Sequence, residues 1–317
     1  MRFIALLAML VVACAAHAQY PARPIKIVVP YAAGGLPDTM TRAVTPKLGE
    51  ALGQAVVVEN MGGAGGISGV TEVARSSADG YTLLVADVGQ IAINPHLFSK
   101  LPYAPLKDLA PVSLIGTSPL YLVAHPSVPA NSLQQLVAYA KAHPGKLNYG
   151  SSGIGSIHHL ATEALKAGFG IDIVHVPYKG TGQSVPALLG GQVALLYSAL
   201  PSIAGHLKDG KVKILAISSA KRSAQTPEVP TVAESGIPGY DYVAEIGMLA
   251  PAATPREIIQ RLAGEIAKVV KQPDVVQRFT QLGIDAVGST PEAYATLNKS
   301  DYEKYAKLVK ASGAKID

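Results

Sequence analysis

Four glycine-rich turns recur along this chain, and each one lies between a short apolar run and a segment with helical spacing. The turns span residues 30–38, 60–66, 150–156 and 178–182. Glycine lets the backbone approach a ligand closely, and the start of a helix offers unpaired N–H groups at the positive end of its dipole. One such turn is ordinary, but four of them in one chain predict an anion-binding site built from main-chain amides.

The apolar runs are short and rich in β-branched residues, which is typical of strands that are covered on both faces. Between them lie segments of helical length, such as residues 39–52, 132–143, 156–168 and 181–190. This alternation indicates α/β domains with right-handed crossovers. The expected strands are Ile25–Val29, Ala55–Val58, Thr82–Ala86, Leu120–Ala124, Ile173–Val176, Val193–Tyr197 and Ile214–Ile217.

The chain is expected to pass between two domains twice. Residues 120–124 lead out of the first α/β unit, and residues 247–251 lead back, so that the C-terminal helices pack on the first domain. We therefore predict a discontinuous domain 1 formed by residues 19–122 and 248–317, with domain 2 inserted as residues 123–247. Two crossings make a hinge, and a cleft between two α/β domains is a natural ligand site.

The N-terminus has the composition of a secretory signal peptide over residues 1–18. Arg2 precedes an apolar run over residues 3–13 that is too short to span a bilayer, and a small-residue cleavage site ends at Ala18. We predict secretion with cleavage after Ala18. The alternative is a lipobox that ends at Cys14, which would then carry a lipid.

Composition excludes several other classes of protein. Cys14 is the only cysteine, so a chain cleaved after Ala18 would have neither a disulfide nor a cysteine metal site. The formal net charge is +5, but the basic residues are scattered and never form a run of four. We therefore expect no nucleic-acid partner and no polybasic membrane patch.

Sequence motifs of common enzymes are missing. No window satisfies G-x-G-x-x-G, no Walker lysine follows a glycine turn, and no H-E-x-x-H occurs. Ser152 is not at the centre of a nucleophile elbow, because Ile154 stands at the closing glycine position. We therefore predict a binding protein rather than an enzyme. A secreted hydrolase that uses Ser151 or Ser152 with His159 stays open as an alternative of another class.

Several side chains in the turns could contact a ligand, although each also has an ordinary structural explanation. Asp38 is placed to cap the helix that follows it. Ser151, Ser152 and Ser156 bring hydroxyl groups to a helix start, where a carboxylate can accept charge-assisted hydrogen bonds of about 1.5–3 kcal/mol each. Tyr178 can supply a ring wall and a hydroxyl.

Twelve short segments form a set that keeps its order over nearly the whole chain after residue 18. They are residues 20–25, 29–38, 58–60, 79–84, 92–95, 101–103, 107–112, 148–155, 176–180, 190–193, 227–231 and 249–255. Each segment alone is weak evidence, but together they are specific. With this set the chain resembles the Bug family of periplasmic solute-binding receptors, which belong to tripartite tricarboxylate transporter systems.

This resemblance implies an α/β protein with the two-domain Venus-flytrap fold of type 2 periplasmic binding proteins, in which each domain is a mixed sheet flanked by helices. It implies a periplasmic receptor that captures a small organic carboxylate, namely a dicarboxylate, an aromatic carboxylate or an amino acid, by closure of its domains. The receptor is expected to be a monomer, to need no cofactor or metal, and to deliver its ligand to a tripartite tricarboxylate-type membrane permease. A ligand sensor for a membrane kinase uses the same fold and stays open as an alternative.

The resemblance also implies which residues surround the ligand. One carboxylate is expected against Gly34 and Gly35, often through ordered water, and residues 151–156 with Thr181 complete the cage without any arginine. The candidate ligand-binding residues are Tyr31, Ala33, Gly34, Gly35, Asp38, Asp87, Ser151, Ser152, Gly153, Ser156, His159, Tyr178, Thr181, Ser198 and Glu245.

The chain departs from the family pattern at four positions. Ser198 stands where relatives commonly carry an aspartate, Glu245 where they usually have a tryptophan, and Asp87 where a small hydroxyl residue is commoner. Ala33 replaces a usual proline and is expected to matter less. The first three changes redistribute acidic groups around the cleft and leave room for a ligand other than the ordinary family dicarboxylate.

Overall fold

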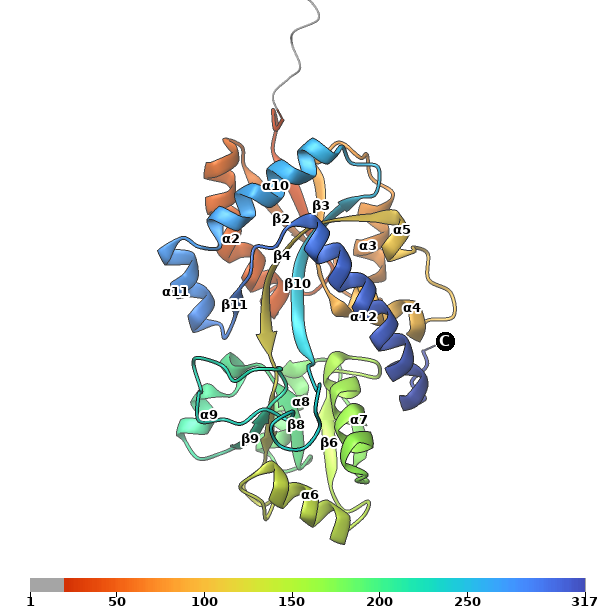
Figure 1. Cartoon of the computed structure of the whole chain (residues 1–317), viewed down its shortest axis with the longest axis vertical. Helices are drawn as coiled ribbons and strands as arrows, with labels where there is room; N and C mark the ends of the chain where they lie inside the picture. The colour runs from red at the N-terminus through yellow and green to blue at the C-terminus, as the bar shows by residue number, and fades with distance from the viewer. Residues whose placement is uncertain (1–19, 317) are drawn as a thin grey trace, which may run out of the picture.

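The structure is a computed structural model that describes residues 20–316, and the predicted signal peptide with Cys14 lies outside these residues. Two lobes stand one above the other, each built around one β-sheet (Figure 1). We call the unit around the six-stranded sheet the first lobe and the unit around the five-stranded sheet the second lobe. No helix within residues 20–316 combines the length and the apolar character that crossing a membrane requires.

The sheet of the first lobe is mixed. Its strands, in order across the sheet, are β11 (Asp285–Ala286), β4 (Leu109–Pro119), β10 (Val243–Pro251), β3 (Thr82–Asp87), β1 (Ile25–Val29) and β2 (Val56–Asn60). β1 pairs in parallel with β2 and β3, whereas β10 runs antiparallel to β3 and β4. The carboxyl ends of β1, β2 and β3 therefore meet at one edge, which is where α/β sheets bind ligands.

Helices cover both faces of this sheet, which explains the continuous apolar runs of its inner strands. They are α2 (Leu36–Leu52), η1 (Ala64–Gly66), α3 (Ile67–Ala74), η2 (Gly89–Ile93), α4 (Asn94–Leu97), α5 (Pro105–Asp108), α10 (Arg256–Val269), α11 (Pro273–Gln281) and α12 (Pro291–Ser312). Ile27 and Val29 of β1 share a core with α2, α10 and α11. Val28 lies on the opposite face, in a core with α3 and α12.

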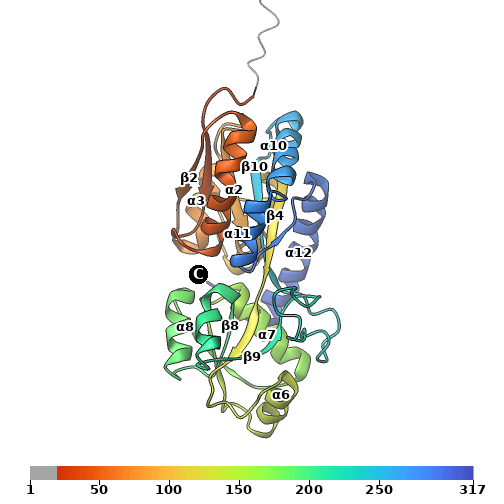
Figure 2. The same ribbon diagram turned by 90° about the vertical axis from the view of Figure 1, so that its left-hand side faces the viewer.

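The second lobe repeats this arrangement with a smaller mixed sheet. Its strands, in order, are β7 (Val174–Pro177), β6 (Asn148–Ser151), β8 (Leu195–Ser198), β5 (Tyr121–Ala124) and β9 (Lys213–Ile217). Its helices are α6 (Leu133–Ala142), α7 (Ile157–Phe169), α8 (Thr181–Leu189), η3 (Leu200–Ser202) and α9 (Ala204–Lys208). Figure 2 shows α7 and α8 on opposite sides of the sheet. The prediction of two mixed sheets flanked by helices is confirmed.

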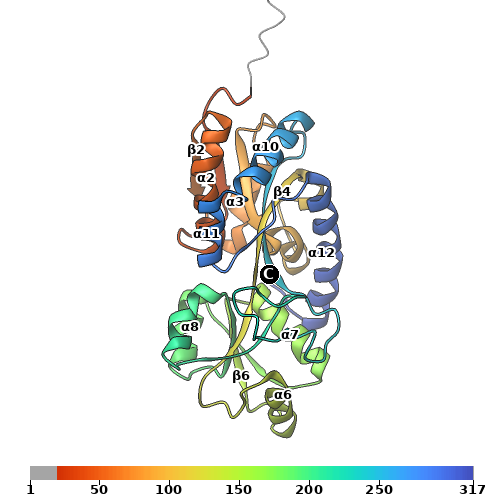
Figure 3. The same cartoon turned by 60° about the vertical axis from the view of Figure 1, so that its left-hand side comes forward.

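Two segments connect the lobes, as the run of β4 toward the second lobe shows in Figure 3. β4 leads into β5 through Leu120, and the chain returns to β10 after β9. The buried Ser218 hydroxyl ties both connections together, because it accepts from the Leu120 N–H (2.9 Å) and donates to the Tyr242 carbonyl (2.6 Å). The predicted boundaries at 122/123 and 247/248 fall inside β5 and β10, and the division into domains stays a prediction.

Candidate ligand-binding site

A cleft of about 630 Å³ lies between the lobes, and residues of all four glycine-rich turns line it. The turns lead from β1 to α2, from β2 to η1, from β6 to α7 and from β7 to α8. Helix starts from both lobes therefore meet at one crevice. The candidate residues that line it are Tyr31, Gly34, Gly35, Asp87, Ser152, Gly153, Ser156 and Thr181.

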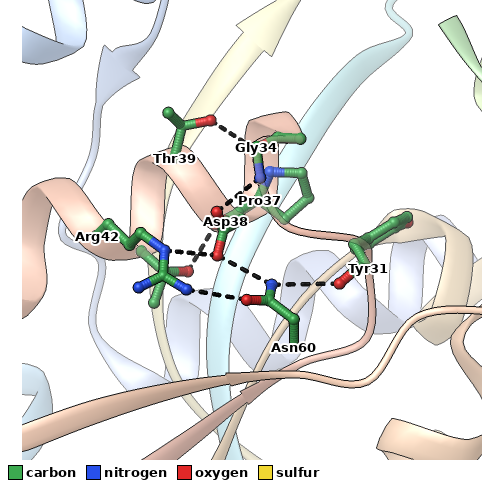
Figure 4. A network of polar contacts seen from close by, with 9 residues as sticks. Tyr31, Gly34, Pro37, Asp38, Thr39, Arg42 and Asn60 are labelled. Atoms are coloured by element: carbon green, nitrogen blue, oxygen red, sulfur yellow. Dashed lines mark hydrogen bonds and ion pairs between the residues drawn. The ribbon is translucent and has the colours of Figure 1, made fainter. Parts of the chain in front are cut away.

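The first turn is held in shape by Asp38, which lies behind it and does not line the cleft (Figure 4). Its carboxylate accepts hydrogen bonds from the Gly34 N–H (2.8 Å), Asn60 Nδ2 (2.9 Å) and Arg42 Nε (2.9 Å). Burial alone would raise the pKa of Asp38, but these hydrogen bonds and the charge of Arg42 outweigh burial and lower it. Because the Gly34 amide is committed to Asp38, a ligand would meet the amides at the start of α2, from Gly35 onward.

The second turn contributes Gly63, Gly65 and Gly66 to the cleft, although we named none of its residues from the sequence. Gln90 joins this turn to the first one, because its Nε2 donates to the Tyr31 hydroxyl (2.9 Å) and to the Gly65 carbonyl (3.2 Å). A Cβ on Gly66 would lie 2.9 Å from Gln90 Nε2, and the φ of Gly66 is 82°, so a larger residue would be strained there. The repeated glycines of residues 60–66 were the sequence signal that this turn lines the cleft.

The third turn presents Ser152 and Ser156 to the cleft but buries Ser151. Ser151 Oγ lies 2.6 Å from His175 Nε2, and this contact anchors the turn to β7. Ser156 caps α7, since its Oγ accepts a hydrogen bond from the His159 N–H (3.3 Å). Ser151 is therefore a supporting residue, and Ser152 and Ser156 are the serines that a ligand would meet.

Two adjacent histidines at the start of α7 have different surroundings. His158, which we did not name as a candidate, lines the cleft with Nδ1 2.7 Å from Ser152 Oγ. His159 lies behind the turn, where its Nδ1 accepts from the Gly155 N–H (3.0 Å) and its ring stacks on His175. Burial lowers the pKa of His158 to about 4 and also lowers the pKa of His159, so both rings are neutral near pH 7. The pairing of Ser151 or Ser152 with the His159 ring, on which the hydrolase alternative depended, is wrong, because Ser151 contacts His175 and Ser152 contacts His158.

The fourth turn brings Thr181 and the exposed Lys179 to the cleft. Tyr178 does not line it, because its ring packs against the apolar core of the second lobe. Ser198 is buried at the end of β8, and Ala33 is exposed away from the cleft. Within residues 20–316, no arginine lines the cleft.

Comparison with known proteins now identifies the family. The family described as "Tripartite tricarboxylate transporter family receptor" matches residues 40–314. The chain belongs to this family. BugT from Bordetella pertussis is 39% identical over 298 residues, which cover 94% of this chain and 91% of BugT. The resemblance to the Bug family is confirmed.

Solved structures share the fold of this receptor. R. palustris Rpa4515 with adipate has a TM-score of 0.84 at 32% identity and covers 94% of this chain and 100% of its own. MatC from Rhodopseudomonas palustris with bound malate has a TM-score of 0.80 at 34% identity and covers 92% of this chain and 100% of its own. The predicted Venus-flytrap fold is confirmed, and the protein is a periplasmic solute-binding receptor of the Bug type.

Asp87 is the acidic residue that lines the cleft of this receptor within residues 20–316. It ends β3, and its Oδ1 accepts a hydrogen bond from the Gly89 N–H (2.7 Å). Burial raises the pKa of Asp87, and hydrogen bonds from the Tyr31 hydroxyl and the Gly89 N–H offset part of this rise.

Glu245 does not line the cleft, because its neighbours in β10 occupy that face. Ala244 and Ile246 line the cleft, and the alternation of a strand directs Glu245 to the other side, toward α12. There, burial and the nearby carboxyl group of Asp301 raise the pKa of Glu245 to about 9. Lys304, whose Nζ lies 3.7 Å from Asp301 Oδ1, offsets only part of this effect.

Proposed function

We propose that this receptor captures a small organic carboxylate in the cleft and delivers it to the permease of a tripartite tricarboxylate transporter. The observation that carries the proposal is the meeting of helix starts from both lobes at one cleft of about 630 Å³. Unpaired N–H groups and the positive dipole end at each helix start favour a negative group. The relatives bound to adipate and malate support a carboxylate as this group.

The cleft offers hydrogen bonds to an anion rather than a dedicated cation. Ser152, Ser156 and Thr181 line it from the second lobe, and His158 is neutral near pH 7. Lys179 is the one lysine among the lining residues described, and its side chain is exposed. A carboxylate would therefore exchange hydrogen bonds to water for hydrogen bonds to amides and hydroxyls.

Capture would proceed by closure of the lobes about the two connections that Ser218 joins. A ligand that touches both walls binds the closed form better, so it shifts the population toward that form. The ligand would leave unchanged, because we assign binding and no chemistry to this cleft. We further propose that the receptor works as a monomer in the periplasm after cleavage behind Ala18.

Calorimetry with a panel of mono-, di- and aromatic carboxylates and amino acids tests the proposal. We expect at least one compound to bind, and small-angle scattering should show a smaller radius of gyration when it is bound. Thr181→Val keeps the shape of the side chain but removes its hydroxyl, and it should weaken binding by about 10- to 100-fold. Thr280→Val, on an exposed face of α11, is the matched control and should bind normally. No heat with any member of the panel would contradict the proposal.

A further inference from the structure

Asp87 brings an acidic group into a cleft where the helix starts favour a bound anion. The residue stands at the carboxyl end of β3, beside Gly89 and Gln90, which also line the cleft. A Cβ on Gly89 would lie 2.8 Å from Asp87 Oδ1 and 3.4 Å from the Tyr31 hydroxyl oxygen. The missing side chain at Gly89 therefore lets the carboxyl group, the phenol and a main-chain amide pack together at this point.

The hydrogen bonds around Asp87 have a defined direction. Gln90 Oε1 accepts from the Asp87 N–H (3.3 Å), which turns Gln90 Nε2 toward the Tyr31 hydroxyl (2.9 Å). Because Tyr31 accepts from Gln90, its own proton is directed to Asp87, to which it is hydrogen-bonded. The Gly89 N–H donates to the same carboxyl group. Two donors thus point at Asp87, which matches the ionised form, since that form only accepts.

Asp87 has no cationic partner among the residues that the structure describes. Within residues 20–316, no lysine, arginine or histidine nitrogen forms an ion pair with Asp87. Asp38, in contrast, has a counter-charge, because its Oδ1 lies 2.9 Å from Arg42 Nε. An ionised carboxylate that is removed from water without a counter-charge is unfavourable, and a plain dianion next to it would add repulsion. A positive group on the ligand would supply the missing counter-charge.

We infer that Asp87 is a specificity-determining residue that binds an ammonium group, so the ligand is a small carboxylate that also carries a charged amino nitrogen. The helix starts would hold the carboxylate, and Asp87 with Tyr31 and Gly89 would hold the ammonium group on the first-lobe wall. This inference rests on the proposed function and narrows its ligand class.

Matched ligands test the inference by calorimetry at pH 7.5. Each set keeps one carbon chain with two carboxylates and changes only the substituent beside one of them. The sets are succinate, malate and aspartate; glutarate, 2-hydroxyglutarate and glutamate; and adipate, 2-hydroxyadipate and 2-aminoadipate, with both enantiomers of every chiral compound. In at least one set, we expect the amino compound to bind at least about tenfold more tightly than both others.

Asp87→Asn should remove this preference by weakening the amino compound about 10- to 100-fold, while the plain dicarboxylate binds as well as before or better. Asp87→Ser, which replaces the carboxyl group with a hydroxyl group, should behave in the same way. Asp209→Asn is the matched control, because Asp209 is exposed on the second lobe beside Lys211, and it should leave the preference intact.

The outcomes separate this inference from the proposed function. Binding of dicarboxylates without any preference for an amino compound, or equal binding of the hydroxy and amino compounds, would overturn the inference and leave the proposed function standing. The inference would also be overturned if Asp87→Asn kept the preference for the amino compound, or if folded Asp87 variants bound no carboxylate at all. If no compound in any set binds the unaltered protein, the inference fails, and the proposed function fails with it only if no other member of the wider carboxylate and amino-acid panel binds either.

Discussion

The cleft has two walls, the first formed by the glycine turns of the first lobe and the second by those of the second lobe. The two walls hold the same kind of turn in place with different interactions. In the first lobe, the glycine turn is fixed by a charged group, because Asp38 accepts from Gly34 and pairs with Arg42 (Figure 4). In the second lobe, the turn is fixed by neutral contacts between hydroxyl groups and imidazole rings, such as Ser151 with His175. A wall that depends on an ionised acid and a wall that depends on neutral histidines respond to pH in different ranges.

The signs of the pKa shifts define these ranges. The pKa of Asp38 is lowered, so its contribution to stability is present above its unfolded value of 3.8 and is lost only as the pH falls below that value. The pKa values of His158 and His175 are lowered from 6.5 to about 4. Their neutral rings therefore contribute stability above pH 6.5 that is lost between pH 6.5 and about 4. We conclude that mild acid weakens the second wall before the first.

Acidification should give the largest loss of stability. Between pH 6.5 and pH 4, protonation of His158 should cost about 2–3 kcal/mol of unfolding free energy, because burial disfavours the charged ring. Chemical unfolding followed over pH 7 to pH 4 measures this loss. His158→Gln should lose less stability over the same range, whereas His143→Gln, an exposed control, should match the unaltered protein. A constant free energy of unfolding down to pH 4.5 would contradict the comparison.

Asp38→Ala should give the next largest effect and act on the first wall. It removes the acceptor of the Gly34 N–H, of one Asn60 Nδ2 hydrogen bond and of Arg42 Nε, which we expect to cost about 2 kcal/mol in urea unfolding. Ligand affinity measured by calorimetry should fall as well, because the amides at the start of α2 lose their fixed position. Asp274→Asn, which removes an exposed charge on α11, serves as the control. Unchanged affinity in Asp38→Ala would show that the network does not position the turn.

Glu245→Gln should act in the opposite direction and stabilise the protein. The pKa of Glu245 is raised, so the folded state favours the neutral carboxyl group. The stability that this neutral group contributes is fully present below pH 4.5 and is lost as the pH rises toward about 9. Glutamine keeps the neutral form at every pH. The variant should nearly match the unaltered protein near pH 5 and become increasingly more stable than it as the pH rises from 5 to 9. A variant that is less stable at pH 9 would contradict this assignment.

The strand-and-helix alternation could be predicted from the sequence where local pattern decides the structure. The apolar run Ile25–Val29 is β1, and the glycine turn after it leads into α2 as expected. β4 and β10 were not predicted, because prolines, serines and a glycine interrupt the apolar character of β4, and Glu245 and Gly247 interrupt that of β10. Ser113 and Ser118 of β4 are buried and donate to the Ser289 and Gly283 carbonyls. A local sequence pattern does not reveal partners that lie so far away along the chain.

The candidate site could be predicted as turns but not as individual side chains. Which of His158 and His159 meets the cleft depends on the rotation of α7 against the sheet, which adjacent positions in a sequence do not reveal. Glu245 was placed at the cleft because it stands where relatives of the family usually have a tryptophan, and only the alternation with Ala244 and Ile246 shows that it faces α12. Asp38 was expected as a cap or a ligand contact, and its role depends on Arg42 and Asn60 together.

A crystal structure of the ligand-bound protein tests the central claim most directly, since that claim assigns one carboxylate ligand to helix starts from both lobes. We expect ligand carboxylate oxygens within ~3 Å of amides at the start of α2 and of the hydroxyls of Ser156 or Thr181, with the lobes closed around the ligand. A ligand that contacts only one lobe, or that lies outside this cleft, would contradict the account.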